Sequence, residues 1–567
     1  MRRLEDLLYQ VDHRGYPAYK SLHGVYRFPF YTLSIDHVQG DPFAAPSSLS
    51  IRIEASRHGF RRELYEVTHR RIMLQDFLLR AFYRELSRMS HRTRGSGKSG
   101  LLSVSACHQE VLERSALEID PASGLLTVRF SAGFPANGRT TLAMELRKML
   151  MDYVPQCVER SLISEAVPMA ELRAWISLSD DQKAIRDALP GMGLIAFVAN
   201  GAILPRKSGI DDAPMARAVA FESPSEDLVT IPLPGGRTIS GLGIRRGITL
   251  IVGGGYHGKS TLLEALERGV YNHIPGDGRE YVITEESAMK IRSEDGRSVK
   301  ELDISQFIRN LPSGKNTACF STEDASGSTS QAANTVEAVL SGSRTLLIDE
   351  DTSATNFMVR DSLMQHVINP KNEPIIPFIS RMRQMYETLG VSTILVAGSS
   401  GAFFHIADTV LHMKEYRPFD ITELAKRTAA SEGSAPDSAD AFVPFEDHRI
   451  PSKNREVTDS RRVKVRGSGT DSVSLNHESV ELRFVEQVVD TEQTNLLGSL
   501  LRTLEEQYFN SRDSLTRCVD DLYDHLLREG FSAAFGPSIP GNLTMIRKHE
   551  LWAMVNRYRA LQLVRRP

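Results

Sequence analysis

The sequence is poor in cysteine and tryptophan, and it has no long apolar run. Its four cysteines are scattered over 567 residues, so we expect neither a disulfide framework nor a paired-cysteine metal site. No uninterrupted apolar stretch approaches the roughly 18 residues that a membrane-spanning helix needs, and no apolar signal-peptide core follows Met1. The composition therefore predicts a cytoplasmic, globular protein of several domains, without a transmembrane segment.

An excess of charge of one sign is also lacking, since the formal net charge is −3. This balance argues against a protein that coats nucleic acid along its whole surface. The charge is uneven, however, and residues 57–98 hold many arginines and few acids. A solvated helix face and a polyanion site both explain such a run. The candidate nucleic-acid contacts within it are Arg61, Arg62, Arg92, Arg94 and Lys98.

The most informative feature that is present is a glycine-rich loop between an apolar strand at 248–252 and a helix. In such a P-loop, backbone N–H groups and the helix N-terminus face phosphate oxygens. Lys259 then faces the β- and γ-phosphates, and Ser260 offers a hydroxyl to Mg²⁺, so we expect ATP or GTP to bind. The predicted nucleotide-binding residues are Gly253, Gly254, Gly255, Tyr256, His257, Gly258, Lys259, Ser260 and Thr261.

A second Gly-Lys-Ser triplet, at 97–99, does not match this motif. Arg92 stands where a P-loop has its first glycine, and residues 101–104 read as a short strand rather than as a helix. We interpret the triplet as a basic turn. Such a turn is either simply solvated or meets another phosphate, such as that of a nucleic acid.

An apolar strand that ends in consecutive carboxylates follows at 344–351. This is a Walker B pattern, in which Asp349 at the strand end holds Mg²⁺ through its water shell. Glu350 then orients and polarises the water that attacks the γ-phosphate.

A Ser-Gly pair, Ser326 and Gly327, precedes an apolar helix shortly before this strand. In placement it resembles the ABC-ATPase signature, Leu-Ser-Gly-Gly-Gln. By that resemblance the two residues face the γ-phosphate bound by a second subunit, so that two nucleotides lie between two head-to-tail domains. Read alone, a Ser/Gly-rich segment is as often a loop.

The whole pattern resembles one group, the predicted ATPases of the ABC class, which lack transmembrane partners. The segments that carry the resemblance are 14–20, 253–261, 325–331, 346–356 and 463–467. Membership implies the ABC fold, ATP, Mg²⁺ and a homodimer, with RNA or another nucleic acid as a partner.

The sequence departs from most ABC enzymes at two places. Asn356 stands where the D-loop usually has aspartate, and residues 397–400 lack the switch histidine, for which Ser399 or Ser400 is a candidate substitute. Gln306 has the spacing of a Q-loop glutamine, and Phe221 suits either adenine stacking or a buried core.

The missing histidine keeps a second hypothesis open, an ATP-sensing dimeric platform with little hydrolysis. A small-molecule kinase is a weaker reading, because a kinase has no use for the Ser-Gly signature.

The chain order predicts an α/β protein, a P-loop NTPase of ABC type with flanking regions. Strands alternate with helices after the P-loop, which favours a largely parallel sheet. Residues 430–460 are rich in Ser, Ala, Asp, Glu and Pro, which favours a linker or surface insertion. The predicted regions are an N-terminal α+β domain at 1–225, the ATPase at 226–425, a linker at 426–462 and a mostly helical region at 463–567.

Overall fold

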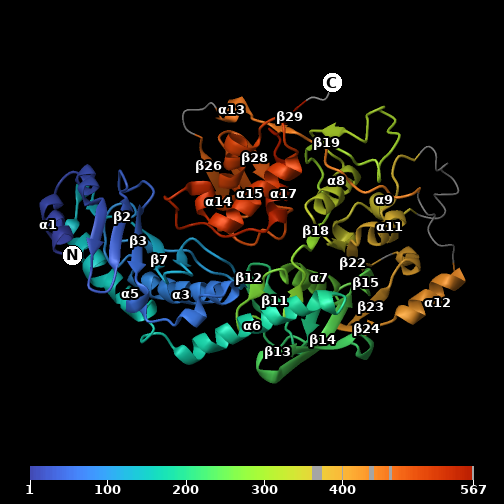
Figure 1. Ribbon diagram of the computed structural model, residues 1–567, viewed down its shortest axis with the longest axis horizontal. Helices are drawn as coiled ribbons and strands as arrows, with labels where there is room; N and C mark the ends of the chain where they lie inside the picture. The colour runs from blue at the N-terminus through green and yellow to red at the C-terminus, as the bar shows by residue number, and fades with distance from the viewer. Residues whose placement is uncertain (361–372, 399, 433–439, 459–462, 565–567) are drawn as a thin grey trace. The chain divides into compact units, whose positions relative to one another are not determined.

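The protein folds into two compact units, seen in a computed structural model (Figure 1). The model describes residues 1–360, 373–398, 400–432, 440–458 and 463–564. The first unit comprises Met1–Asp181 and Phe535–Met545, and the second comprises Gln182–Ala534 and Ile546–Pro567.

The first unit is built on a six-stranded antiparallel sheet of order β1-β2-β3-β7-β4, with β6 also paired to β7. Its central strand β7 (Leu126–Ala132) alternates buried and half-buried residues, as a strand with one covered face should. The long helix α3 (Thr68–Met89) lies against β4 and β6. The other strands are β1 (Gly24–Arg27), β2 (Thr32–His37), β3 (Ser47–Ile53), β4 (Leu102–Ser103) and β6 (Leu117–Ile119).

A late segment of the chain returns to this first unit. The Ser115 hydroxyl donates a hydrogen bond of 2.7 Å to the carbonyl of Pro540, and Arg114 donates to the Thr544 hydroxyl at 2.9 Å. Residues Phe535–Met545 therefore belong to the first unit. The unit's remaining elements are α1 (Arg2–Val11), α2 (Ala55–His58), β5 (Glu110–Val111), β8 (Ala136–Asn137), β9 (Thr140–Thr141), α4 (Ala143–Lys148) and α5 (Val154–Ser161), and α6 (Met169–Gly191) contains the boundary between the units.

A six-stranded sheet of order β18-β21-β22-β15-β23-β24 forms the centre of the second unit. All neighbouring pairs that include β15, β18, β21 or β22 are parallel, and only β24 runs antiparallel to its neighbour. Carboxyl ends of parallel strands share one edge of a sheet, where α/β proteins bind ligands. The strands are β15 (Ile248–Val252), β18 (Met289–Ile291), β21 (Thr345–Asp349), β22 (Ser392–Ala397), β23 (Thr409–Lys414) and β24 (Arg417–Asp420).

A second, antiparallel sheet of order β13-β14-β10-β17 belongs to the same unit. Its strands are β10 (Leu194–Ala199), β13 (Leu228–Leu233), β14 (Arg237–Arg245) and β17 (Val282–Thr284). The N-terminal region predicted from the sequence, 1–225, includes β10. Because β10 is hydrogen-bonded to β14 and β17, it is part of the second unit instead, and the first unit's N-terminal stretch ends at Asp181 rather than at 225.

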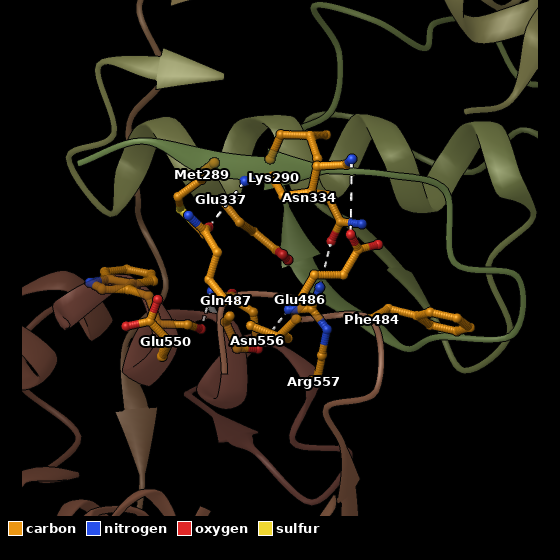
Figure 2. Close-up of a pocket in the computed structure, with 15 residues that line it drawn as sticks. Met289, Lys290, Asn334, Glu337, Phe484, Glu486, Gln487, Glu550, Asn556 and Arg557 are labelled. Carbon is orange, nitrogen blue, oxygen red and sulfur yellow. Dashed lines mark hydrogen bonds and ion pairs between the residues drawn. The ribbon is translucent and has the colours of Figure 1, made fainter. Parts of the chain in front are cut away.

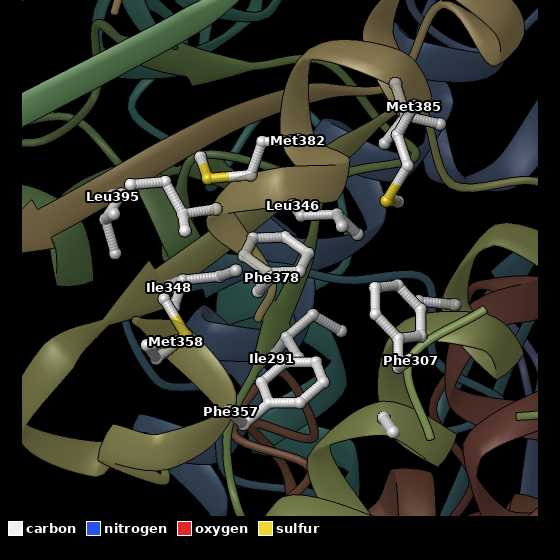
Figure 3. Close-up of a cluster of buried hydrophobic side chains, with 14 of the residues drawn as sticks. Ile291, Phe307, Leu346, Ile348, Phe357, Met358, Phe378, Met382, Met385 and Leu395 are labelled. Carbon is white, nitrogen blue, oxygen red and sulfur yellow. The ribbon is translucent and has the colours of Figure 1, made fainter. Parts of the chain in front are cut away.

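An apolar core holds the parallel sheet against its helices (Figure 3). Three phenylalanines, Phe307, Phe357 and Phe378, pack against one another within it, with ring centroids 5.4 to 6.1 Å apart. Such aromatic contacts add about 0.5–1.5 kcal/mol each beyond the burial of area. Phe357 follows the Walker B strand, so the core fixes the segment beyond Glu350. The helices around this sheet are α7 (Lys259–Arg268), α8 (Gly327–Leu340), α9 (Thr355–Met358), α11 (Ile379–Leu389) and α12 (Thr422–Glu432).

The region after residue 463 is not mostly helical at its start. Its three-stranded antiparallel sheet, β26-β27-β28, packs against α14, and Gly498 of α14 allows this approach because a Cβ there would lie 2.5 Å from Val465. Strands β27 and β28 were not predicted, because each has only four residues and at least half of them are polar. The elements are β26 (Val465–Ser468), β27 (Ser472–Leu475), β28 (Glu478–Glu481), α14 (Thr491–Thr503), α15 (Leu515–Glu529), α16 (Ser532–Phe535), α17 (Lys548–Arg557) and β29 (Gln562–Leu563).

The predicted linker at 426–462 is only partly described, because 433–439 and 459–462 lie outside the described residues. Helix α12 extends to Glu432, and Arg381 donates a 2.6 Å hydrogen bond to the carbonyl of Asp440, which ties this segment to the ATPase core. The short elements not yet named are β11 (Arg206–Ser208), β12 (Asp211–Pro214), β16 (Asn272–His273), β19 (Val299–Leu302), β20 (Phe320–Thr322), β25 (Pro451–Ser452) and α13 (Arg455–Thr458). Among the described residues, no helix is both long and apolar enough to cross a membrane.

Candidate nucleotide site

The P-loop follows β15 and ends at the first residue of α7. Gly253 has φ 142°, and a Cβ there would lie 2.4 Å from the carbonyl oxygen of Met413, so only glycine fits. Gly258, with φ 92°, precedes α7, whose first turn has no side-chain cap. The first N–H groups of this helix are therefore available to an anion. Lys259 spans the loop and donates a 2.8 Å hydrogen bond to the carbonyl of Gly254.

Two further loop residues have distinct environments. Nδ1 of His257 accepts a hydrogen bond of 2.9 Å from the N–H of Glu415, which ties the P-loop to the turn between β23 and β24. Tyr256 has φ 62° and is 99% exposed, so its ring packs against none of the described residues. Gly254, Gly255 and Ser260 are exposed, and Thr261 is half-buried.

The Walker B strand β21 places Asp349 and Glu350 at the same edge as the P-loop. Asp349 is 5% exposed, and its carboxylate accepts a 3.1 Å hydrogen bond from the N–H of Asp351. Ser260 and Asp349 line one open cavity of about 510 Å³. One hydroxyl, one carboxylate and room for water are the surroundings that Mg²⁺ takes beside substrate phosphates. The residues present therefore fit this ion.

Glu350 contacts the segment directly after β22, which lacks the switch histidine. Its Oε2 accepts a 2.6 Å hydrogen bond from the N–H of Gly398, one residue after β22. Ser399 lies outside the described residues. The Ser400 hydroxyl accepts from the N–H of Ala402 and caps the following 3-10 turn, so this serine already has a structural role.

The signature segment lies at the surface. Ser326 is exposed and directly precedes α8, with its hydroxyl 3.1 Å from that of Thr329. Gly327 is the first residue of the helix and is half-buried. A helix N-terminus with an exposed hydroxyl and no side-chain cap is a suitable anion contact.

The sequence analysis assigned no role to the rest of the signature segment, residues 328–331. In the structure, side chains of this segment form hydrogen bonds to the D-loop. Gln331 is fully buried, and its amide donates to the Ser353 hydroxyl at 2.9 Å and accepts from the N–H of Ala354 at 2.8 Å. Ser328 donates to the side chain of Asn356 at 2.6 Å. The atypical Asn356 thus has a partner within its own chain. The Ser-x-x-x-x-Gln spacing of the motif was the only sequence signal for this arrangement.

Two weaker candidates are not brought into contact with the P-loop. Phe221 is 2% exposed, so it belongs to the core rather than to an adenine platform. Gln306 is 8% exposed, and its side chain accepts a long hydrogen bond of 3.5 Å from the N–H of Val443. This contact is with the segment after α12.

The five basic candidates all lie in the first unit, at differing exposure. Arg61 and Arg62 are 78% and 68% exposed, at 3.7 Å from Glu63 and 3.5 Å from Glu66 respectively. Arg92 and Arg94 are exposed, whereas Lys98 is half-buried. The turn that contains Lys98 is held by the Ser99 hydroxyl, which accepts from the N–H of Ala136, and it leads into strand β4. The interpretation of this turn as no P-loop is confirmed.

Three family models match successive parts of the chain. The N-terminal model for ATPases of the ABC class matches residues 1–165, the P-loop domain model of ABC ATPases matches 168–446, and the MRB1590 C-terminal domain model matches 464–564. The chain is also 32% identical over 253 residues to the uncharacterized protein MJ1628 of Methanocaldococcus jannaschii. The aligned part covers 42% of this chain. It spans about half the length of that relative, 54%.

Solved ABC structures are similar to only part of this chain. The cbiO1 protein from Clostridium perfringens, part of the ABC transporter complex cbiONQ, has a TM-score of 0.24 at 15% identity, covering 40% of this chain and 87% of its own. The ATP-binding cassette MJ0796, solved as a dimer bound to ADP and Pi, has a TM-score of 0.20 at 14% identity, with 34% and 93% covered. By its family models and its P-loop domain, this chain belongs to the ABC class of ATPases and is an ABC-type P-loop ATPase.

Proposed function

We propose that the chain hydrolyses ATP with Mg²⁺ between two copies arranged head to tail. Lys259 and the loop N–H groups bind the phosphates, while Ser260 and Asp349 hold the ion, which neutralises charge on the β- and γ-phosphates. Glu350 is the base that orients the attacking water. Ser326 and Gly327 complete the nucleotide site of the other copy.

The observation that carries this proposal is the exposure of Ser326 at the start of α8. No side chain caps the helix there, so its hydroxyl and N–H groups are available to a phosphate from outside the chain. Gln331 holds the same helix against the D-loop, since it bonds both Ser353 and Ala354. The surface offered to a second copy is thereby pre-organised, which lowers the entropic cost of pairing.

The hydrolytic role of Glu350 is supported by its bond to Gly398. A carboxylate held by a backbone N–H has a fixed orientation, which suits a group that must direct a water molecule. The backbone N–H of Gly398 thus orients the Glu350 carboxylate without a histidine. This arrangement favours hydrolysis over the alternative, an ATP-sensing platform with little turnover.

Closure of the dimer would move the regions that flank the ATPase. A buried polar network ties α8 to the C-terminal helix α17, and Figure 2 draws one of its hydrogen bonds, from Arg557 to the side chain of Asn334. Arg297 donates to Glu337 at 2.8 Å and to the carbonyl of Asn556 at 3.2 Å. Breaking a buried pair of this kind costs about 3–5 kcal/mol, so α17 is expected to follow α8.

The partner that these movements serve is proposed to be a polyanion, RNA in the first instance. The proposal rests on the basic residues of the first unit, with Arg92 and Arg94 exposed. Arg61 and Arg62 contribute less, because each lies near a glutamate that offsets its charge.

Steady-state turnover at high protein concentration tests the proposal. We expect measurable phosphate release that Lys259→Ala abolishes, and we expect Glu350→Gln to bind ATP, lose turnover and accumulate an ATP-bound dimer. Tight ATP binding without turnover by the natural chain would favour the platform instead. Hydrolysis at the normal rate by Glu350→Gln would remove Glu350 from the role of base, and phosphorylation of a small molecule would indicate a kinase.

A further inference from the structure

Arg292 directly follows strand β18 of the central sheet and lies beside the Walker B aspartate, Asp349. Strand β18 pairs in parallel with β21, and its last residue, Ile291, lies opposite Ile348. The next position in this register sets Arg292 beside Asp349, and neighbouring strands are about 4.8 Å apart. Arg292, Asp349 and Ser260 also line the same cavity. A guanidinium group therefore stands at the edge where Mg²⁺ and the terminal phosphate are proposed to bind.

The present partners of Arg292 come from the C-terminal region. Its guanidinium donates to Glu486 at 2.6 Å and lies 4.5 Å from the centre of the Phe484 ring. The pair is partly open, with side chains 24% and 26% exposed. The buried Nε of Arg292 has no hydrogen-bond partner. The guanidinium is thus held in place but retains an unused donor.

Glu486 would not be left unpaired if Arg292 moved. Its carboxylate also lies 3.9 Å from the ammonium of Lys290, an ion pair drawn in Figure 2. The neighbouring Gln487 remains anchored, because its amide donates to the carbonyls of Glu267 and Ala288 at 3.2 and 3.0 Å. Exchange of partners by Arg292 therefore leaves no buried charge without a counter-ion.

The backbone at Arg292 is also attached to the signature helix. The Asn334 side chain, on α8, donates to the carbonyl of Arg292 at 2.9 Å, and the Ser330 hydroxyl accepts from the N–H of Glu294 at 2.8 Å. One residue thus connects the Mg²⁺ edge, the signature helix and the C-terminal region.

We propose that Arg292 binds the terminal phosphate of ATP and that Glu486 is its counter-ion when no triphosphate is present. The terminal phosphate carries more negative charge than the carboxylate of Glu486 that it must displace, and arginine binds phosphate with paired, charge-assisted hydrogen bonds. ADP lacks the terminal phosphate, so it leaves the Arg292–Glu486 pair intact. The C-terminal region thereby responds to triphosphate specifically. This inference rests on the proposed function, since it requires ATP at the P-loop.

The test compares ATP with ADP by titration calorimetry with Mg²⁺, in the hydrolysis-silent Glu350→Gln background. Arg292→Ala is expected to weaken ATP binding by about tenfold or more and to change ADP binding by less than about twofold. Glu486→Gln frees the guanidinium and is expected to tighten ATP binding a few fold, again without effect on ADP. Misfolding would not produce this gain, so the second variant keeps the test decisive. Arg483→Ala is the matched control, because Arg483 stacks on the same Phe484 ring at 5.8 Å but pairs with Glu481.

Equal losses of ATP and ADP affinity in Arg292→Ala, or no loss of either, would overturn the inference. Either result leaves the proposed function standing, provided that Lys259→Ala still abolishes turnover. Amide hydrogen exchange gives a second readout. ATP, but not ADP, is expected to speed exchange in residues 482–488, and Arg292→Ala should remove that difference. The same exchange with both nucleotides would also contradict the inference.

Discussion

Glu350 and Gly398 are joined by a 2.6 Å hydrogen bond from the backbone N–H of Gly398 to Oε2 of Glu350. The bond connects the ends of the adjacent parallel strands β21 and β22. A side-chain contact from this strand would require a particular residue, whereas a backbone N–H is present in any residue except proline. The absence of a histidine at 397–400 therefore does not leave Glu350 without orientation.

Removal of this N–H tests that role. Gly398→Pro is expected to lower kcat by about tenfold to a hundredfold, because a small misplacement of a base is costly, while ATP affinity stays within about twofold. Rapid measurement of phosphate release and calorimetric titration with ATP give the two values. Gly398→Ala is the control, since it keeps the N–H and its Cβ would lie 3.9 Å from Glu350, an ordinary contact. Equal turnover in the two variants would show that the bond does not position Glu350.

The buried amide of Gln331 is expected to stabilise the fold and the dimer surface together. Gln331→Leu removes the hydrogen bonds of the Gln331 amide to Ser353 and Met358 and leaves the N–H of Ala354 without its acceptor, at a cost of about 1–3 kcal/mol. Thermal unfolding should show a lower Tm, and turnover should fall even at saturating ATP. Thr329→Ala, in the same helix, removes only an exposed contact with Ser326 and should leave Tm unchanged. A Tm for Gln331→Leu equal to that of the natural chain would contradict this account.

Much of the nucleotide site was predictable because its signals are local. The fixed spacing of Gly253, Gly258 and Lys259 encodes a turn that only glycine allows, and the structure has these φ values. The strands at 248–252 and 345–349 were indicated by apolar runs, and both are present as β15 and β21. The long helix α3 likewise follows from apolar residues at helical spacing.

What could not be predicted depends on contacts between distant segments. Strand β10 reads as any apolar strand, and only its pairing with β14 and β17 assigns it to the second unit. The return of 535–545 to the first unit rests on hydrogen bonds to Ser115, which leave no periodic pattern. Gln331 is a helix residue whose partner Ser353, 22 positions away in the sequence, becomes visible only in three dimensions.

Stability should depend on pH through Asp227. Burial, and then the neighbouring carboxylate of Asp420, raise the pKa of Asp227 to about 6 from its ordinary value of 3.8. The folded state thus holds the proton more tightly than the unfolded state, so stability is fully present below pH 3.8 and falls as pH rises through about 6.

Asp227→Asn removes this loss, because the amide carries no charge. The variant is expected to melt at a higher temperature than the natural chain at pH 8, with a gain about half as large at pH 5, where only part of the loss has occurred. Glu226→Gln, at the adjacent exposed position, serves as the control. It removes the smallest of the contributions that raise this pKa and should change the melting temperature far less than Asp227→Asn does. A constant difference between Asp227→Asn and the natural chain at both pH values would contradict the assignment.

The polyanion proposal is testable by charge reversal on the first unit. Replacement of Arg92, Arg94 and Lys98 by glutamate is expected to weaken RNA binding about tenfold and to flatten its dependence on salt, because fewer counterions are released. Fluorescence anisotropy with a single-stranded RNA at several salt concentrations measures both. The same reversal at the exposed Arg466 and Arg512 of the second unit is the control. Unchanged binding after reversal on the first unit would remove these residues from any RNA contact.

Mixing two inactive variants tests the head-to-tail site most directly. Lys259→Ala removes the phosphate contact of a copy's own P-loop, and Ser326→Glu places a negative charge where the partner's phosphate would approach. If Ser326 acts on the other copy, a mixed dimer has one intact site, because the Ser326→Glu copy supplies the P-loop and the Lys259→Ala copy supplies the serine. An equal mixture should then recover about one quarter of the natural rate, since half of the dimers are mixed and each has one of two sites. No recovery above the rates of the separate variants would contradict the shared site.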